Sequence, residues 1–188
     1  KDMRSMLLSE LYYRNKKNIG LEESTNKLLD LAKGEYVAVF DHDDISLPDR
    51  LKKEVEYLDY HPDVGLVSGQ FTIFGIQNST SNNPIKNDDI KKKLETESCV
   101  SHTTAMFRKS VLDKNNIRYE KEFFPAASYR IITKTALVTK VHNLPDILLR
   151  YRMDGNNTSI KHANQRVKAR KQLRKEYVEA REAQYIKE

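Results

Sequence analysis

Four polar residues in a row, Asp41-His42-Asp43-Asp44, follow a short apolar run at positions 36–40. The run starts after Gly34 and is rich in strand-forming residues, which predicts a buried β-strand that ends at the acids. Open α/β sheets bind their ligands at the carboxyl ends of the strands. Carboxylates this close repel one another, so we expect them in water or around a cation. Asp41 and Asp43 can turn toward one ion, and their hard oxygen atoms suit Mg²⁺ or Mn²⁺.

A simpler interpretation of the same residues is a solvated turn that caps the next helix. An Asp-x-Asp pair is frequent by chance, and Asp44 is the acid that best fits such a cap. His42 is interpreted as a spacer, because the alternation of side chains along a strand points it away from its neighbours. The position of the acids after an apolar strand favours the cation site over the simple turn.

Further blocks of residues follow in a fixed order along the chain. Asn18-Ile-Gly20 precedes the acids, and Ser46-Leu-Pro48-Asp-Arg50 comes after them. The blocks at 102–112 and 143–159 complete the series. In this order and at these spacings the chain resembles the family 2 glycosyltransferases, over roughly residues 11–160.

The resemblance implies both a fold and a reaction. The fold is the A-type glycosyltransferase fold, an α/β structure with a Rossmann-like, mixed and mainly parallel sheet flanked by helices. The reaction is the metal-dependent, inverting transfer of a sugar from a nucleotide-sugar, expected to be a UDP-sugar. The acceptor would be a glycan or a lipid-linked molecule, as in the synthesis of polysaccharides and glycoconjugates. Mn²⁺ or Mg²⁺ would be the cofactor.

The resemblance also assigns roles to single residues. Asp41 would lie nearer the ribose of the donor, and Asp43 would bind the metal directly. The other implied site residues are Asn18, Gly20 and Arg152 on the donor side, Asp154 as an additional metal ligand, and His102 on the acceptor side. An ordinary turn explains Asn18 and Gly20 equally well, and His102 fits a structural role as readily as a binding role.

The chain departs from the family pattern at the general base. An inverting transferase needs a carboxylate that takes the proton of the acceptor hydroxyl. The family supplies a Glu-Asp pair at a helix start, but here Ala127 and Ser128 occupy these positions. Ser128 therefore stands at the expected base position, with Glu120 and Glu122 as substitutes from the preceding loop. The alternative is a catalytically impaired protein that serves as a binding or scaffold module.

A second departure concerns the front of the fold. The family begins with strands that hold the nucleotide base, and no residues of this type precede position 11. We therefore expect an N-terminally incomplete sheet. The chain would then be a portion of a longer polypeptide, or another copy or chain would complete the sheet.

Phosphatases of the haloacid dehalogenase type offer a third interpretation of the acids. Their nucleophilic Asp-x-Asp motif also follows a strand, but it has Thr or Val where Ile45 stands here. No convincing set of a downstream lysine and an acidic pair accompanies it. This alternative therefore ranks last.

Composition limits the class of protein. The 188 residues suffice for one domain with a core. The single cysteine, Cys99, excludes an internal disulfide framework and fits a reducing compartment. No apolar run approaches the ~20 residues that cross a bilayer, so we expect a cytoplasmic protein, with the inner face of the membrane as an alternative place.

The net charge of +6 is concentrated in the last segment. Residues 161–188 contain nine Lys or Arg and four Glu, whereas residues 1–160 are nearly neutral. A nearly neutral body argues against a partner nucleic acid. We divide the chain into a glycosyltransferase-like domain, 1–160, and a basic amphipathic C-terminal helix, 161–188.

The C-terminal helix carries one thin apolar stripe, formed by Ala169, Leu173, Tyr177 and Ala180. The stripe can pack on its own domain or on a neighbouring subunit. Alternatively the basic helix can contact anionic lipids near a lipid-linked acceptor. The stripe is only weakly apolar, so we favour packing.

Local patterns predict the remaining elements. A helix at 1–10 and a strand at 11–13 would begin the chain, and Ser24 or Thr25 would cap a helix that ends at Lys33. Ser46 and Asp49 would form a capping box for a helix that buries Leu51, Val55 and Leu58. Strands are expected at 64–76, 100–107 and 146–151, and helices at 88–94 and 125–137.

Overall fold

The computed structural model describes residues 13–155 and 157–186. The predicted helix at 1–10 and almost all of the strand at 11–13 lie outside these residues. The helices are α1 (Leu21–Leu31), α2 (Arg50–Tyr60), α3 (Asn87–Lys93), α4 (Lys109–Lys114), α5 (Ala127–Val138), α6 (Thr158–Lys161) and α7 (Ala163–Tyr185), with 3-10 turns at His102–Thr104 and Lys121–Phe123. The strands are β1 (Tyr36–Ala38), β2 (Ile45–Ser46), β3 (Val64–Gly75), β4 (Ser79–Thr80), β5 (Met106–Arg108) and β6 (Lys140–Met153).

The strands form one mixed sheet in the order β1-β5-β3-β6-β2, with β4 attached to β3. The expected α/β fold with a mixed sheet is confirmed. The predominance of parallel strands is not: β3 with β6 is the one parallel pair among the strands described, and the other four pairs are antiparallel. That parallel pair is nevertheless the longest, because it runs from Val64 opposite Lys140 to Gly75 opposite Met153.

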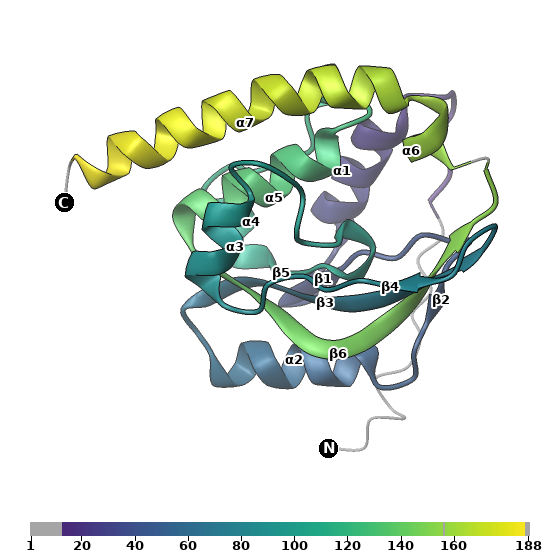
Figure 1. Ribbon diagram of the computed structural model, residues 1–188, viewed down its shortest axis with the longest axis horizontal. Coiled ribbons are helices and arrows are strands. Elements are labelled where there is room, and N and C mark those ends of the chain that lie inside the picture. The colour runs from purple at the N-terminus through teal and green to yellow at the C-terminus, as the bar shows by residue number, and fades with distance from the viewer. Residues whose placement is uncertain (1–12, 156, 187–188) are drawn as a thin grey trace.

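Two apolar clusters fill the space on either side of the sheet. Along β3 the side chain of Leu66 enters one cluster and that of Val67 the other, as expected from the alternation of a strand. Leu58 of α2 packs in the smaller cluster, whereas α5 and α7 pack in the larger one. The result is three layers, with α2 on one face of the sheet and α5, with α7 outside it, on the other (Figure 1).

The predicted helix starts near the front of the chain need correction. Helix α1 begins at Leu21 after Gly20, and the hydroxyls of Ser24 and Thr25 donate to carbonyls one turn earlier instead of capping. The helix ends at Leu31, two residues before the expected end. Gly20 has φ 89°, a conformation that glycine adopts without strain, so the turn sets the start of the helix.

Helix α2 also differs from the prediction. Ser46 lies in β2 and no side chain caps the helix, so the expected capping box with Asp49 is wrong. The buried side chains are those of Arg50, Glu54 and Leu58, whereas Leu51 is 53% exposed. Leu58 is buried as predicted and Val55 packs against the same cluster, but Arg50 and Glu54 occupy the buried face in place of Leu51.

Three strand predictions also change. The strand expected at 36–40 covers only residues 36–38 and is half-buried, because in the part of the sheet that is described it pairs with β5 alone. The strand expected at 100–107 is a 3-10 turn followed by the short β5. The last strand, β6, begins at Lys140, well before the expected start at 146, and ends at Met153, two residues after the expected end.

Helix α7 packs against the larger apolar cluster, which the rest of the chain forms on one side of the sheet. Leu173 is fully buried and Tyr177 is 2% exposed, and both belong to the cluster that contains α5. Ala169 packs against the same cluster. The apolar stripe thus faces its own domain, as favoured from the sequence.

Arg50 and Glu54 form an ion pair inside the protein, with side-chain exposures of 1% and 0%. The Nε of Arg50 lies 3.2 Å from Oε1 of Glu54, while Oε2 of Glu54 is buried without a partner among the described residues. Burial raises the pKa of Glu54 to about 7, although the charge and hydrogen bond of Arg50 act in the opposite direction. The pair is costly in stability, so its retention calls for a physical reason.

The first prediction concerns α7. Replacing Leu173 by Ala is expected to lower the free energy of unfolding by about 2–5 kcal/mol, because it leaves a cavity under the helix. Val167→Ala is the matched control, since Val167 lies on the same helix and is 67% exposed. Urea denaturation measures both, and similar values for the two variants would contradict the docking of α7.

The second prediction concerns the buried pair. Because the folded-state pKa of Glu54 lies above its ordinary value, the folded protein holds a proton between about pH 4.5 and 7 that the unfolded chain lacks. The associated stability is present at low pH and is lost as the pH rises through the folded pKa. The stability of the wild type relative to Glu54→Gln should therefore fall between about pH 5 and about pH 8. Denaturant titrations of both proteins at the two pH values test this. If the stability of the wild type relative to Glu54→Gln rises with pH, the predicted direction is wrong.

Candidate functional site

The acidic segment, residues 41–44, connects β1 to β2 in a tight turn. The backbone N–H of Asp44 donates to the carbonyl of Asp41 at 3.2 Å, which closes the turn. Asp41 is exposed, Asp43 is half-buried, and Asp44 is buried. The three acids thus point into different surroundings.

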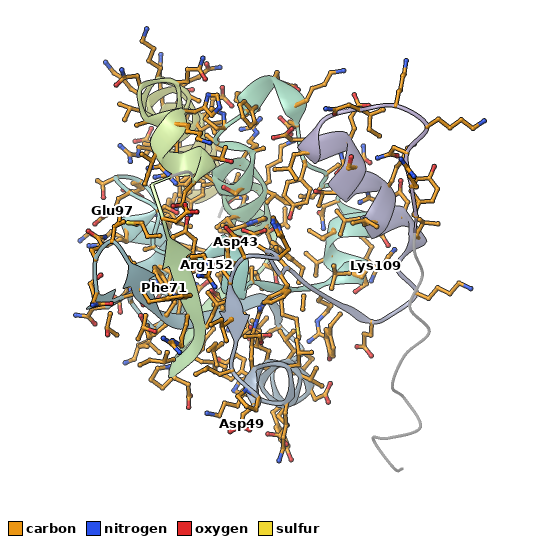
Figure 2. The ribbon with its side chains drawn as sticks, turned by 90° about the vertical axis from the view of Figure 1, so that its right-hand side faces the viewer. Asp43, Asp49, Phe71, Glu97, Lys109 and Arg152 are labelled. Atoms are coloured by element: carbon orange, nitrogen blue, oxygen red, sulfur yellow. The ribbon has the colours of Figure 1, made fainter. Side chains whose placement is uncertain are left out.

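Arg152, near the end of β6, lies across the acidic segment. Its backbone N–H donates to Oδ1 of Asp44 at 2.9 Å, and its Nε donates to the carbonyl of Asp43 at 2.9 Å. Figure 2 shows Asp43 and Arg152 close together. The guanidinium also stacks over the ring of Phe74, 4.7 Å from its centroid. The fold therefore brings together residues that are more than 100 positions apart.

The electrostatics of the segment indicate negative charge that the protein does not fully offset. Burial raises the pKa of Asp44 to about 6 in spite of the bond from Arg152, and Oδ2 of Asp44 is buried without a partner among the described residues. Asp41 is exposed as a residue, but the protein atoms around its carboxylate raise its pKa, and the charge of Asp43 raises it further. A cation at this place would relieve the repulsion.

The carboxylate oxygens of the acidic segment suit a divalent ion that is bound partly by the protein and partly by a substrate. No group of three or more metal-binding side chains occurs in the described ranges. Mg²⁺ is usually bound by only one or two carboxylates together with substrate phosphates. Asp41 and Asp43 can supply these carboxylates, and both are accessible from solvent.

Asn18 and Gly20 form a turn of their own at the start of α1. Oδ1 of Asn18 accepts a hydrogen bond from the N–H of Gly20 at 2.9 Å, and the carbonyl of Gly20 accepts from Ser24. Both residues are exposed. These bonds account for the turn without a ligand, so a donor-binding role stays a prediction.

His102 contacts Tyr119, a residue that the sequence analysis did not single out. Nε2 of His102 lies 2.8 Å from the hydroxyl of Tyr119, and burial lowers the pKa of His102 to about 4. The imidazole is therefore neutral near pH 7. Asn26 clamps the backbone of Tyr119 from both sides, through hydrogen bonds of 2.8 and 2.9 Å. Burial raises the pKa of Tyr119, and the nearby charge of Asp41 adds to this effect.

The start of α5, where the family places its general base, carries no carboxylate side chain. Ser128 is half-buried and is the second residue of the helix, not its cap, because Ala126 takes that position. Glu120 is held by Arg130 at 3.1 Å and by a short bond from Lys134. Burial alone would raise the pKa of Glu120, but these cations lower it overall, which makes the carboxylate a weak proton acceptor.

Glu122 and Asp154 lie on exposed turns. Glu122 is part of the 3-10 turn before α5. Asp154 follows β6, where its backbone N–H donates to Oδ1 of Asn157 at 3.2 Å. Asn157 also donates to the carbonyl of Arg152 at 2.8 Å, so Asp154 sits on a turn that is tied to the arginine. Its role as an additional metal ligand stays a prediction.

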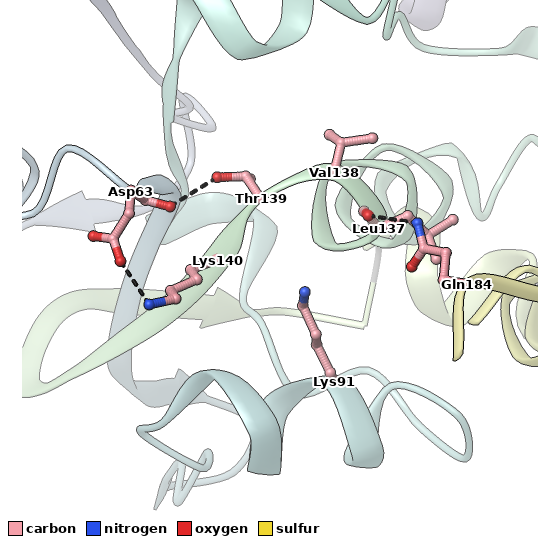
Figure 3. Close-up of a pocket in the computed structure, with 7 residues that line it drawn as sticks. All are labelled: Asp63, Lys91, Leu137, Val138, Thr139, Lys140 and Gln184. Atoms are coloured by element: carbon pink, nitrogen blue, oxygen red, sulfur yellow. Dashed lines mark hydrogen bonds and ion pairs between the residues drawn. The ribbon is translucent and has the colours of Figure 1, made fainter. Parts of the chain in front are cut away.

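A surface cavity of about 550 Å³ lies elsewhere, between the starts of β3 and β6 and the ends of α5 and α7 (Figure 3). Its lining includes the ion pair of Asp63 with Lys140, at 2.7 Å, and Gln184, which donates to the carbonyl of Leu137 at 2.9 Å. Because β3 and β6 are parallel, the acidic segment at Arg152 lies at the other end of this pair, roughly 30 Å away along the strands. The cavity is therefore separate from the acidic segment.

Comparisons with known proteins bear on the family and the fold of the chain. Curated relatives include an uncharacterized glycosyltransferase, MJ1057, of Methanocaldococcus jannaschii, 28% identical over 76% of this chain and 50% of the relative. The amylovoran biosynthesis glycosyltransferase AmsE of Erwinia amylovora is 29% identical over 72% of this chain and 52% of its own length. The chain thus spans about half the length of the curated relatives that it matches.

Solved structures confirm the expected A-type glycosyltransferase fold. TarS of S. aureus in complex with UDP-GlcNAc gives a TM-score of 0.59 at 19% identity, over 74% of this chain and 41% of TarS. The mannosyltransferase PcManGT of Pyrobaculum calidifontis, in complex with GDP-Man and Mn²⁺, gives 0.52 at 19% identity, over 78% and 40%. At these identities the likeness concerns the fold alone.

The family model described as glycosyl transferase family 2 matches residues 10–115, more than half of the chain and including the acidic segment. The matched region ends before α5, so it does not bear on the residues at the base position. On this match, and with the fold that the solved structures share, the chain belongs to glycosyl transferase family 2.

Proposed function

We propose that this chain binds a nucleotide-sugar and a divalent metal ion for the transfer of the sugar to a glycan or a lipid-linked acceptor. The observation that carries the proposal is the contact between the acidic segment after β1 and Arg152 near the end of β6. Arg152 is more than 100 residues away in sequence and donates two hydrogen bonds of 2.9 Å to the segment. Carboxylates for a cation and a guanidinium for phosphate thus meet at one place.

Each residue of this place has a proposed role. Asp43 binds Mn²⁺ or Mg²⁺ directly, and Asp41 lies nearer the ribose of the donor. When bound, the ion neutralises charge that develops on the departing diphosphate. Arg152 holds the carbonyl of Asp43 in place, and its positive charge favours a diphosphate beside the acids.

Similar proteins support the choice of donor and cofactor. PcManGT binds GDP-Man with Mn²⁺, and TarS binds UDP-GlcNAc. We propose a UDP-sugar as donor and Mn²⁺ or Mg²⁺ as the ion. The relative AmsE, a glycosyltransferase of amylovoran biosynthesis, supports a role in the synthesis of polysaccharides or glycoconjugates.

A second candidate function is a binding module without efficient catalysis. It rests on one observation: the start of α5 presents Ala127 and Ser128, and Glu120 is paired with two cations. Donor binding does not require a general base, so this candidate shares the metal site with the first. The phosphatase alternative has no support from the family assignment.

The third prediction tests the metal site. Asp43→Asn should strongly weaken Mn²⁺-dependent binding of UDP in titration calorimetry, because an amide oxygen lacks the negative charge with which a carboxylate attracts the ion. Asp49→Asn is the matched control: it removes the same charge six residues away, from an exposed position at the start of α2 whose side chain makes no capping bond (Figure 2).

The control should bind like the wild type. Equal binding by wild type and Asp43→Asn would show that Asp43 is no ligand. A wild-type protein that takes up neither Mn²⁺ nor any of UDP, UDP-GlcNAc and GDP-Man would contradict the proposed function as a whole.

The fourth prediction separates the two candidate functions. Ser128→Asp should raise the rate of donor turnover, since a positioned general base contributes about 10²–10⁴-fold to a proton transfer. The affinity for Mn²⁺ and UDP should not change. Ser128→Asn is the matched control, because it has the same shape and cannot accept the proton. Equal turnover by the two variants would mean that the lack of an acid at Ser128 does not limit the reaction.

A further inference from the structure

Arg50 is the largest fully buried side chain of the described residues, with 1% exposure. A buried guanidinium costs several kcal/mol unless its donors are satisfied, so its partners indicate what it does. Two partners lie in different elements. Nε reaches Glu54 on α2 at 3.2 Å, and a terminal nitrogen donates to the carbonyl of Val39 at 2.7 Å.

Val39 is the point at which the chain leaves the sheet and enters the acidic segment. Its N–H donates to the carbonyl of Ala105 at 2.9 Å, so the residue that directly precedes β5 holds one side of Val39. Arg50 holds the other side through the carbonyl. Both backbone groups of Val39 are thus fixed, two residues before Asp41.

The other end of the acidic segment is fixed independently. Asp44 accepts from the N–H of Arg152, and its own N–H donates to the carbonyl of Asp41. The segment is therefore tied at Val39 by α2 and at Asp44 by β6. Only the part between these points, which carries the carboxylates of Asp41 and Asp43, is open to solvent.

We propose that Arg50 is a positioning residue for the metal and diphosphate site, and that Glu54 holds Arg50 in the orientation that grips Val39. The inference rests on the proposed function and adds two residues to it. Arg50 itself does not reach the substrate, because it is buried beneath the segment. Its charge also acts on Asp41 and partly offsets the effects that raise the pKa of this acid.

The geometry requires an arginine. Two nitrogens of one planar group point to Glu54 and to Val39 at the same time. A lysine has a single ammonium group on a flexible stem and cannot hold both partners in the same fixed fork. Arg50→Lys therefore keeps the charge while it loses the bridge between helix and segment.

A simpler role for the pair would be to stabilise α2 alone. Such a role predicts that a loss of the bridge lowers stability and leaves the acidic segment as it was. The positioning role predicts a local effect at residues 40–44. Supporting residues around a metal site typically change its affinity by about 10–100-fold when they are replaced.

The experiment compares Arg50→Lys with Lys53→Met. Lys53 lies on the same helix and forms an ion pair with Asp146 at 2.7 Å, so its replacement also breaks an ion pair of α2 but does not touch Val39. Calorimetry with Mn²⁺ and UDP should give at least about tenfold weaker binding for Arg50→Lys. Lys53→Met should stay within about twofold of the wild type, as expected for a partly exposed pair.

Hydrogen exchange provides a readout that does not depend on the function. Amides at 40–44 should exchange faster in Arg50→Lys than in Lys53→Met, with α7 unchanged in both. If Arg50→Lys does not fold, Glu54→Gln replaces it, with the same direction expected at a smaller size.

The outcomes separate the inference from the proposed function. If the wild type binds neither Mn²⁺ nor UDP, the proposed function fails, and the exchange at 40–44 alone decides whether Arg50 positions the segment. If the variants at Arg50 or Glu54 bind and exchange like Lys53→Met, the positioning role is wrong.

Discussion

The site depends on holding like charges near one another at the edge of a sheet. Asp41, Asp43 and Asp44 repel, and a free chain would turn them apart into water. The protein prevents this by fixing the backbone at both ends of the segment, through Val39 and through Asp44. If a cation binds here as proposed, it meets carboxylates on a backbone that is already fixed, so little of its binding energy would be used to order the chain.

The long parallel pair of β3 and β6 determines what lies beside this segment. The pair starts at Val64 and Lys140 and continues to Phe74 and Arg152, with irregular register near Gly69. A Cβ atom at Gly69 would lie 2.5 Å from Cδ1 of Leu148, so the leucine side chain packs directly over this glycine and would have to shift for any larger residue. Arg152 reaches the acids because β6 is long enough to extend to the end of β3.

Part of this arrangement could be predicted from the sequence. The acids after a strand and the packing of the α7 stripe follow from patterns that local physics explains, whereas Arg152 was assigned to the site only through the family resemblance. The prediction that the first strand is buried was wrong, because the apolar residues at 36–40 do not show whether a neighbouring element covers the strand. Tyr119 was missed because its contact with His102 is made only in the folded chain.

The burial of Arg50 and Glu54 shows why the helix face was mispredicted. Hydrophobic periodicity selects Leu51, Val55 and Leu58, and it treats charged residues as solvated. In the structure the positions 50, 54 and 58 share the buried face, one turn apart. The guanidinium of Arg50 donates to the carbonyl of Val39, a contact between the helix and the acidic segment that hydrophobic periodicity cannot show.

The start of α5 illustrates the opposite case, in which fold and chemistry are independent. Tyr129, Ile131 and Ile132 anchor the helix in the core, and the Tyr129 hydroxyl bonds to the carbonyl of Leu94. These contacts do not involve the side chain of Ser128, so an acid at this position is not needed for folding. The proposed metal site belongs to the acidic segment, which Arg50 and Arg152 hold by contacts that do not involve Ser128. Donor binding can therefore persist in a chain whose base position carries no acid, and only a measurement that separates binding from turnover distinguishes an enzyme from a binding module.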